Sequence, residues 1–237
     1  MKEPMACQVK DLYAGYGDMI VVNGVNIYVK IGEKVALLGP NGSGKTTLIN
    51  TIAGLLKPFK GEIRLFGYDI TGLKPHEIAE LGVSIVPEGG RVFPRLTVME
   101  NLLVAIPRKG KSYMLIEEIF KLFPVLKERR EQLAGTLSGG EQRMLAIARA
   151  LVRNPKLLII DELSLGLAPK LVLTLYKALN ELWETSRISI LVTEQFVKMA
   201  LEFSHRAYFI ELGSIVLEGP SQELIENPYV KRVYLGV

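Results

Sequence analysis

A chain of 237 residues can bury one substantial core, and 49% hydrophobic with 23% charged residues is the composition of a globular protein rather than a disordered one. The net charge of +4 suits an anionic ligand or an anionic membrane surface, and the lack of a long basic run excludes a polybasic nucleic-acid tail. The single cysteine, Cys7, excludes an intramolecular disulfide and favours a reducing compartment.

The amino-terminal residues contain no apolar stretch of the kind found in a signal peptide. No segment approaches the roughly 18 to 20 consecutive apolar residues that a membrane-spanning helix needs. We therefore expect a cytosolic chain that is soluble when isolated, so that any membrane role would come through a partner.

The first third of the chain predicts strands and turns around one helix. Residues 7–12, 25–31, 34–38 and 62–66 have the apolar patterns of strands, with Cys7 buried in the first of them. Between the last two, residues 45–56 carry apolar side chains at helical spacing: Leu48, Ile49, Ile52 and Leu55. The run 83–86, bounded by Gly82 and Pro87, predicts a buried strand.

From residue 97 to about residue 153 the apolar spacing becomes helical. The apolar run 157–160 predicts another buried strand. Pro169 suits the first turn of a helix with one apolar face, formed by Val172, Leu175, Tyr176, Leu179 and Trp183. Residues 188–192 predict a strand, and residues 207–212 and 215–218 predict a hairpin around Gly213 and Ser214. Strands that alternate with helices predict an α/β core, into which the helical stretch is inserted.

Residues 39–46 read Gly-Pro-Asn-Gly-Ser-Gly-Lys-Thr and fit the phosphate-loop pattern G-x-x-x-x-G-K-[ST] between a predicted strand and a predicted helix. Glycines let backbone N–H groups approach phosphate oxygens, and the start of the helix adds positive potential. Lys45 would reach the β- and γ-phosphates of ATP, and the Thr46 hydroxyl would bind Mg²⁺. The predicted nucleotide-binding residues are Gly39, Pro40, Asn41, Gly42, Ser43, Gly44, Lys45, Thr46 and Thr47.

Two carboxylates follow directly after the predicted strand 157–160. Asp161 would hold Mg²⁺ through its water shell, because hard cations prefer oxygen ligands. Glu162 is placed to orient or deprotonate the attacking water. A phosphate loop needs such a second, acidic strand end, so the pair completes the predicted catalytic edge of the sheet. His76 and His205 are expected on polar connections and are not candidate ligands or bases.

A third motif, residues 137–143, reads Leu-Ser-Gly-Gly-Glu-Gln-Arg. Ser138 and Glu141 fit a capping box, a structural device that begins a helix. Two glycines in the first turn weaken a helix by about 1 kcal/mol each, which a cap alone would not favour. Gly139 and Gly140 have a reason to be there if a phosphate lies against the start of this helix. The unpaired backbone N–H groups and the Ser138 hydroxyl would then donate hydrogen bonds to it.

With these motifs in this order, the whole chain resembles the ATP-binding-cassette (ABC) ATPases, whose signature sequence corresponds to residues 137–142. The resemblance implies an α/β fold, a P-loop NTPase core with an antiparallel β subdomain (about 1–88 and 154–237) and an inserted α-helical subdomain (about 89–153). It also implies that two such domains pair head to tail, each ATP lying between the glycine loop of one and the signature of the other. Tyr16, between Gly15 and Gly17, would stack on adenine.

Several positions depart from the usual pattern of the family. Glu88 stands where a glutamine is usual, and a carboxylate there would still bind Mg²⁺. Gln195 stands where a histidine is usual and would donate a hydrogen bond to the γ-phosphate without carrying charge. Leu163 and Ala168 replace a proline and an aspartate. These changes point to altered communication between the two sites and to a slow ATPase in the isolated chain.

Most of these departures recur together in one branch of the family. Residues 87–102, 164–169 and 193–195 are similar to the smaller ATP-binding subunit of branched-chain (hydrophobic) amino-acid importers, although Leu163 departs even from that branch. The resemblance implies a peripheral protein on the cytoplasmic face of the membrane, paired with a second ABC ATPase as a hetero- or homodimer. Its other implied partners are transmembrane permease subunits and, indirectly, a periplasmic or extracellular substrate-binding protein.

The resemblance further implies a groove that receives a short coupling helix of the permease. The residues that would form it stand at the start of the helical stretch: Arg91, Val92, Phe93 and Pro94. Core packing of Val92 and Phe93 is the alternative interpretation.

The motifs together predict an ATPase that energises a transporter. ATP and Mg²⁺ would be bound by Lys45, Thr46, Asp161 and Glu88, while Glu162 promotes hydrolysis and Gln195 senses the γ-phosphate. Other cargoes fit the same motifs, namely urea or short amides for an importer, or lipid or lipopolysaccharide for an exporter. A soluble cassette ATPase acting on ribosomes or DNA is a further alternative, opposed by the single cassette and the short helical insertion, and we expect no nucleic-acid partner. A subunit that binds ATP without hydrolysing it is opposed by Glu162.

Overall fold

The computed structural model describes residues 4–106 and 112–235. One sheet has six strands, in the spatial order β10 (Ser214–Pro220), β9 (Arg206–Glu211), β3 (Lys34–Leu38), β8 (Ser189–Glu194), β7 (Leu157–Ile160) and β6 (Val83–Val86). Neighbours in this sheet pair in parallel, except that β10 is antiparallel to β9. The second sheet is antiparallel, in the order β2 (Met19–Lys30), β1 (Met5–Tyr16), β4 (Lys60–Leu65) and β5 (Tyr68–Asp69).

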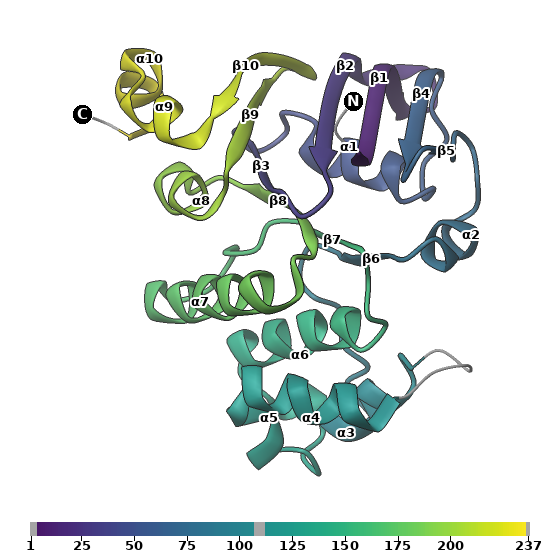
Figure 1. Ribbon diagram of the computed structural model, residues 1–237, viewed down its shortest axis with the longest axis vertical. Coiled ribbons are helices and arrows are strands. Elements are labelled where there is room, and N and C mark those ends of the chain that lie inside the picture. Colours follow the sequence, from purple (N-terminus) through teal and green to yellow (C-terminus); the bar gives the residue numbers. More distant parts are fainter. Residues whose placement is uncertain (1–3, 107–111, 236–237) are drawn as a thin grey trace.

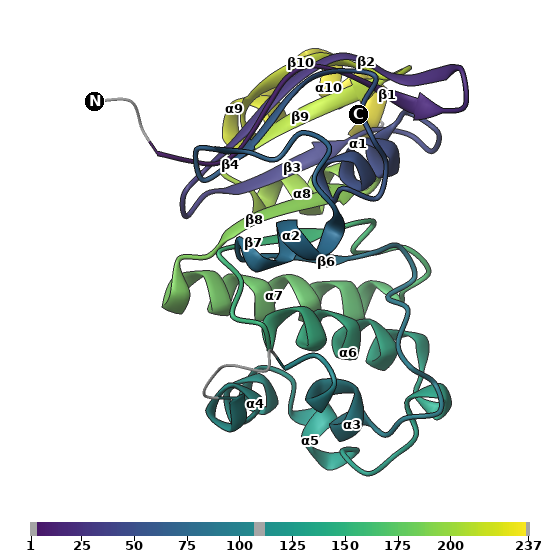
Figure 2. The ribbon, with the colours of Figure 1, turned by 90° about the vertical axis from the view of Figure 1, so that its right-hand side faces the viewer.

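Strands of the parallel sheet alternate their side chains between two hydrophobic cores. On β3, Ala36 and Leu38 face one core, while Val35 and Leu37 face the other. The second core also contains residues of β1, β2 and α1 (Lys45–Ile52), so α1 is packed between the two sheets. Because both faces are covered, these strands are continuous apolar runs in the sequence. Figure 2 shows the resulting layers, with β3, β8 and β7 between α1 on one side and α7 and α6 on the other.

The remaining helices cover the other face of the parallel sheet and the end of the molecule that is lowest in Figure 1. They are α3 (Val98–Leu103), α4 (Ser112–Leu122), α5 (Pro124–Glu128), α6 (Gly139–Leu151), α7 (Pro169–Ser186), α8 (Val197–Phe203), α9 (Ser221–Glu226) and α10 (Pro228–Val230), with short helical turns at η1 (Ala134–Thr136) and η2 (Lys231–Leu235). The exception is α2 (Pro75–Glu80), whose Ile78 packs in the same core as α1. Helices α3 to α6 pack on one another, and α6 also reaches β6. Within the described ranges, no helix is both long and apolar enough to cross a bilayer.

The predicted α/β fold class is confirmed, as are the burial of Cys7 and the hairpin at Gly213. Three local predictions were wrong. Strands β1 and β2 are longer than the apolar patterns indicated, because they pair with each other along most of their length. Helix α1 ends at Ile52, since Gly54 has a φ of 71° and the Leu55 N–H bonds to the Asn50 carbonyl, which leaves Leu55 64% exposed. His76 lies in α2 rather than in a loop.

Candidate functional site

The loop between β3 and α1 is shaped by glycines. A Cβ on Gly39 would lie 2.3 Å from the Ile210 carbonyl oxygen, so no larger residue fits there. Gly44 is the N-cap of α1, with a φ of 106° and no side-chain cap, which leaves the first N–H groups of the helix available. The buried Ser43 hydroxyl has no hydrogen-bond partner among the described residues. An uncapped helix start with an orphaned hydroxyl fits an anion such as a phosphate group.

Lys45 lies folded back into this loop. Its ammonium donates hydrogen bonds to the carbonyls of Gly39 and Pro40, at 2.8 and 3.0 Å. The same nitrogen lies 3.0 Å from Glu162 Oε1, and the two side chains are only 3% and 6% exposed. The structure therefore joins the predicted phosphate-binding lysine to the predicted catalytic carboxylate, across the edge of the sheet where β3 and β7 end.

The other oxygen of Glu162 is held by Gln195. Gln195 Nε2 donates to Glu162 Oε2 at 2.9 Å and also to the side-chain oxygen of Asn41 in the glycine loop. Glu162 has a φ of 52°, a left-handed conformation that is strained for a residue other than glycine and is typical of functional sites. The three predicted positions Lys45, Glu162 and Gln195 thus form one connected cluster.

Asp161 is held in place by a neighbouring strand. The Thr193 hydroxyl donates to Asp161 Oδ1 at 2.6 Å and accepts from the Glu162 N–H at 2.8 Å. Asp161 itself is 2% exposed. Thr193 belongs to β8, which pairs in parallel with β7 beside it, so adjacent strand ends hold both acidic residues. The sequence reasoning did not single out Thr193.

Arg143 is a second residue that the sequence reasoning missed. It lies in the second turn of α6, buried, and its guanidinium donates to the carbonyls of Pro87, Asp161 and Glu162 at 2.9, 2.6 and 2.6 Å. Burial lowers its pKa, and the nearby carboxylates of Asp161, Glu194, Glu162 and Glu88 oppose that shift. An arginine at the fifth position after the N-cap Ser138 is the sequence signal for it, and that signal does not identify the carbonyls it contacts.

The predicted signature residues lie apart from the glycine loop of the same chain. Ser138 and Glu141 form the expected capping box of α6, with hydrogen bonds of 2.8 and 3.3 Å. Among the described residues, no hydrogen bond or ion pair connects residues 138–141 with the glycine loop. A Cβ on Gly140 would lie 2.4 Å from the Leu171 side chain of α7, which would have to move to make room, whereas Gly139 faces open space.

Tyr16 and Glu88 are both exposed. Tyr16 ends β1 with half of its surface exposed (51%), and Glu88 lies in the turn after β6. A ring that faces solvent is free to stack on a ligand, and an exposed carboxylate after a parallel strand is free to move toward one. Neither side chain has a hydrogen bond to the cluster of Lys45, Glu162 and Gln195 within the residues that the structure describes.

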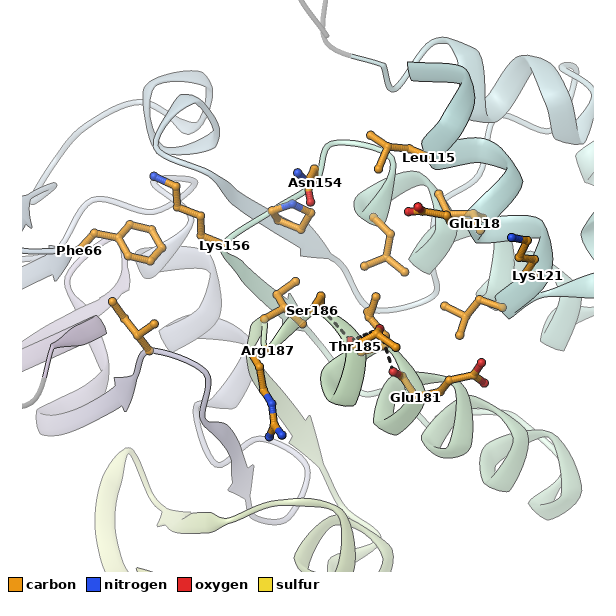
Figure 3. Close-up of a pocket in the computed structure, with 17 residues that line it drawn as sticks. Phe66, Leu115, Glu118, Lys121, Asn154, Lys156, Glu181, Thr185, Ser186 and Arg187 are labelled. Atoms are coloured by element: carbon orange, nitrogen blue, oxygen red, sulfur yellow. Dashed lines mark hydrogen bonds between the residues drawn. The ribbon is translucent and has the colours of Figure 1, made fainter. Parts of the chain in front are cut away.

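Two large grooves stand out among the described residues. The larger, of about 940 Å³, lies between α4 and the carboxyl end of α7, with Lys156 and Arg187 opposite Leu115 and Glu118 (Figure 3). Lys156 and Arg187 precede β7 and β8, so this groove lies at the amino-terminal ends of the strands. The cluster at Glu162 and Gln195 follows their carboxyl ends, which is where ligands bind in open α/β sheets. The larger groove is therefore not the nucleotide site.

The second groove, of about 550 Å³, contains the predicted docking residues Arg91 and Phe93. Phe93 is 46% exposed and carries the Arg149 guanidinium 4.3 Å above its ring, while Arg149 also donates to the Arg91 carbonyl at 2.9 Å. Val92 is half-buried against the core, so the alternative of core packing holds for Val92 and not for Phe93. Pro94 is exposed beside them.

The chain is similar in sequence to known proteins. A family profile described as ABC transporter matches residues 22–164. The high-affinity branched-chain amino acid transport ATP-binding protein BraG of Pseudomonas aeruginosa is 43% identical over 93% of this chain and 95% of the relative. The probable branched-chain amino acid transport ATP-binding protein LivF of Archaeoglobus fulgidus is 37% identical over 95% and 97%. The lipopolysaccharide export system ATP-binding protein LptB of Escherichia coli is 34% identical over 96% and 95%.

Solved structures show the same architecture. An ATP-binding cassette of an ABC transporter in its ADP conformation superposes with a TM-score of 0.82 at 29% identity, covering 98% of this chain and 99% of that chain. A dimeric cassette in a post-hydrolysis state, bound to ADP and inorganic phosphate, has a TM-score of 0.80 at 27% identity, covering 91% and 98%.

Proposed function

The chain belongs to the ABC transporter family, and from that premise we propose that it is the ATP-hydrolysing subunit of an importer for branched-chain amino acids. The proposal of ATP hydrolysis rests on one buried cluster. In it, Lys45 and Gln195 both contact the Glu162 carboxylate, next to a helix start that has no side-chain cap. The observation that supports the cargo is the 43% identity to a branched-chain amino acid transport protein over nearly the whole length of both chains.

Nucleotide binding would rearrange the contacts of Lys45. Phosphate oxygens are stronger acceptors for an ammonium than the two backbone carbonyls it now contacts, because they carry charge. The bare N–H groups at the start of α1 and the unpartnered Ser43 hydroxyl add donors for the same phosphates. Glu162 would then be released from Lys45 and would orient the attacking water, with Gln195 as a neutral donor to the γ-phosphate. Tyr16 would stack on the adenine ring.

The residues around Asp161 also fit a magnesium ion. No group of three or more His, Cys, Asp or Glu side chains gathers as a metal site in the described part of the chain. The donor set would instead consist of Asp161, the Thr46 hydroxyl, Glu88 and phosphate oxygens, all of them oxygen ligands of the kind that Mg²⁺ prefers. Mg²⁺ would neutralise charge on the transferred phosphate. Thr193 already fixes the orientation of the Asp161 carboxylate.

A dimer would complete the site. Ser138, Gly139, Gly140 and Glu141 lie at the start of α6, and they would contact the nucleotide held by a second cassette rather than that of their own chain. The solved structures similar to this chain include a dimeric cassette with bound ADP and phosphate. The helical stretch that carries these residues, about 89–153, would form a subdomain that moves relative to the core at about 1–88 and 154–237.

The partners in the membrane would be permease subunits, docked at the groove with Phe93 and Arg149. The groove joins an exposed aromatic ring to three arginines, Arg91, Arg149 and Arg153. Such a surface suits a short helix that is apolar on one side and carries a carboxylate. A substrate-binding protein on the far side of the membrane would deliver the cargo, so the chain would act at the cytoplasmic membrane surface.

The test is transport in the host cell. Removal of the gene should abolish uptake of radiolabelled leucine, and the parental chain should restore it, whereas Glu162→Gln should not. Affinity purification of the tagged chain in mild detergent should then yield two multi-span permeases and a second cassette ATPase. Normal leucine uptake without the gene, or co-purification with lipopolysaccharide-transport or ribosomal proteins, would contradict the importer assignment and leave the ATPase assignment in place.

A further inference from the structure

Glu194 is a buried acidic residue that the mechanism above does not use. It is the last residue of β8, has no exposed surface, and forms no ion pair within the described residues. Its carboxyl group accepts four hydrogen bonds instead. Oε1 accepts from the Ser164 N–H at 2.9 Å and the Tyr176 hydroxyl at 3.2 Å, and Oε2 accepts from the Ser164 hydroxyl at 2.6 Å and the Gln195 N–H at 3.1 Å.

These contacts join two segments that leave the sheet side by side. Strands β7 and β8 are parallel neighbours, with Ile160 opposite Val192. Glu162 and Ser164 lie on the segment that follows β7, and Gln195 follows β8. Glu194 binds the first segment through Ser164 and the second through the backbone of Gln195. The side chain of Gln195 then reaches Glu162 at 2.9 Å.

We propose that Glu194 is a positioning residue for ATP hydrolysis, whose two carboxyl oxygens fix the Ser164 segment to the Gln195 backbone and so hold the Gln195 carboxamide against the Glu162 carboxylate. The proposal rests on the roles proposed above for Glu162 and Gln195. Burial raises the pKa of Glu194, and the hydrogen bonds from Ser164 and Gln195 oppose that shift. The four hydrogen bonds offset part of the cost of burying this carboxyl group, and they also fix its position relative to both segments.

The arrangement distinguishes a carboxylate from a carboxamide. The two hydroxyl groups can rotate and become acceptors, but the N–H groups of Ser164 and Gln195 can only donate. Each of these two N–H groups faces a different oxygen of Glu194. In a Glu194→Gln variant, the amide nitrogen would face one of the two N–H groups in either orientation. One of the two N–H groups would therefore lose its acceptor and its segment would be displaced, although the volume of the side chain is nearly unchanged.

The test compares hydrolysis with nucleotide binding in the full-length chain. Single-turnover hydrolysis of γ-labelled ATP keeps slow rates measurable, and titration gives the Kd for ATP. Because the proposed displacement is at the reacting groups, Glu194→Gln should lower the hydrolysis rate at least about 10-fold. The Kd for ATP should change less than about 2-fold, because Lys45 and the glycine loop are untouched. The matched control is Tyr176→Phe, which removes a hydrogen bond to the same carboxyl group without releasing either segment and should keep the parental rate.

A double-mutant cycle separates positioning from general destabilisation. If Glu194 acts through Gln195, the variant with both Glu194→Gln and Gln195→Ala should hydrolyse ATP no more slowly than Gln195→Ala alone. Additive losses, a parental rate for Glu194→Gln, or equal losses for Tyr176→Phe would overturn the proposal. Glu162→Gln, assayed in parallel, tests the underlying mechanism separately. A parental rate there contradicts the role of Glu162, whereas a loss there with none at Glu194→Gln contradicts only the present inference.

Discussion

The ammonium of Lys45 lies 3.0 Å from the carboxylate of Glu162, with both side chains buried. With the roles proposed above, the γ-phosphate of ATP and the Glu162 carboxylate would compete for this ammonium. Binding of ATP would then free Glu162 to act on the attacking water.

The first prediction concerns Glu162→Gln. The variant should bind ATP at least as tightly as the parent, because a negative charge beside the incoming phosphate is removed. Its hydrolysis rate should fall by about 100-fold or more, because general-base catalysis contributes that much. Equilibrium titration and single-turnover hydrolysis measure the two quantities. Glu181→Gln, an exposed position on α7, is the control. Hydrolysis by Glu162→Gln at the parental rate would contradict the role.

The second prediction concerns Gly213, which connects the hairpin to the glycine loop. Its N–H donates to the Ser43 carbonyl at 3.0 Å, and a Cβ there would lie 2.0 Å from the Val21 carbonyl oxygen. Gly67 has a similar φ (86° against 81°) but open space around it. We expect Gly67→Ala to lower the free energy of unfolding by about 1 kcal/mol, from backbone strain alone.

Gly213→Ala should cost about 1 to 3 kcal/mol more than Gly67→Ala, because the added methyl group also overlaps the backbone of β2. It should weaken ATP binding as well, because the Ser43 carbonyl loses its donor and the loop shifts. Urea unfolding of both variants and ATP titration measure these effects. Equal stability losses in the two variants would show that the close approach to Val21 is not retained in solution.

The third prediction concerns the docking groove. Phe93→Ala should weaken association with the permease at least about 10-fold, because a central exposed aromatic residue is typical of an interface hot spot. ATP binding should be unchanged, because Phe93 does not contact the glycine loop. Tyr68→Ala is the control, since Tyr68 is also an exposed aromatic residue, at 66%, but lies on β5 outside the groove. Detergent-stable co-purification quantifies the effect, and equal losses in both variants would refute the assignment.

The fourth prediction concerns Ala168, the N-cap of α7. Its backbone is extended, with φ −65° and ψ 143°, and it offers no side-chain cap, while Pro169 begins the helix. Ala168→Asp should raise the free energy of unfolding by about 1 kcal/mol, because the carboxylate would accept a hydrogen bond from an N–H group of the first turn and interact with the helix dipole. Ala168→Asn separates the hydrogen bond from the charge. An unchanged urea midpoint in both variants would mean that solvent already satisfies this N–H group.

The fifth prediction concerns Cys7, which has no exposed surface in β1. Burial raises the pKa of its thiol to about 12. The folded thiol stays neutral at pH 8.5, so it should resist alkylating reagents until the chain is unfolded in urea. The unfolded thiol ionises near its ordinary value of 9.0. The contribution of Cys7 to stability is therefore complete below that pH and is lost as the pH rises toward 12. Labelling of the native chain at the rate of the unfolded chain would contradict this.

The sequence alone determined the motifs and the strand and helix types around them. The spacing of Gly39 to Thr46, the apolar strand before Asp161 and the capping box at Ser138 are local patterns, and local patterns are set by backbone propensity and side-chain periodicity. They predicted the α/β fold class, which the two sheets confirm. The same patterns misplaced the ends of β1, β2 and α1, because strand pairing and the turn at Gly54 decide where those elements end.

Only the tertiary structure decided how the motifs meet. Glu162 and Gln195 are 33 positions apart in the chain and Lys45 is farther still, yet parallel pairing of neighbouring strands brings their side chains within hydrogen-bond distance. The same pairing buries Thr193 and Glu194 at the end of β8, and the packing of α6 against this edge buries Arg143. Several of their hydrogen-bond partners are backbone groups, which residue type does not reveal. A sequence pattern identifies which groups can donate or accept, but the partner of each group is chosen by the packing of segments that are distant in the chain.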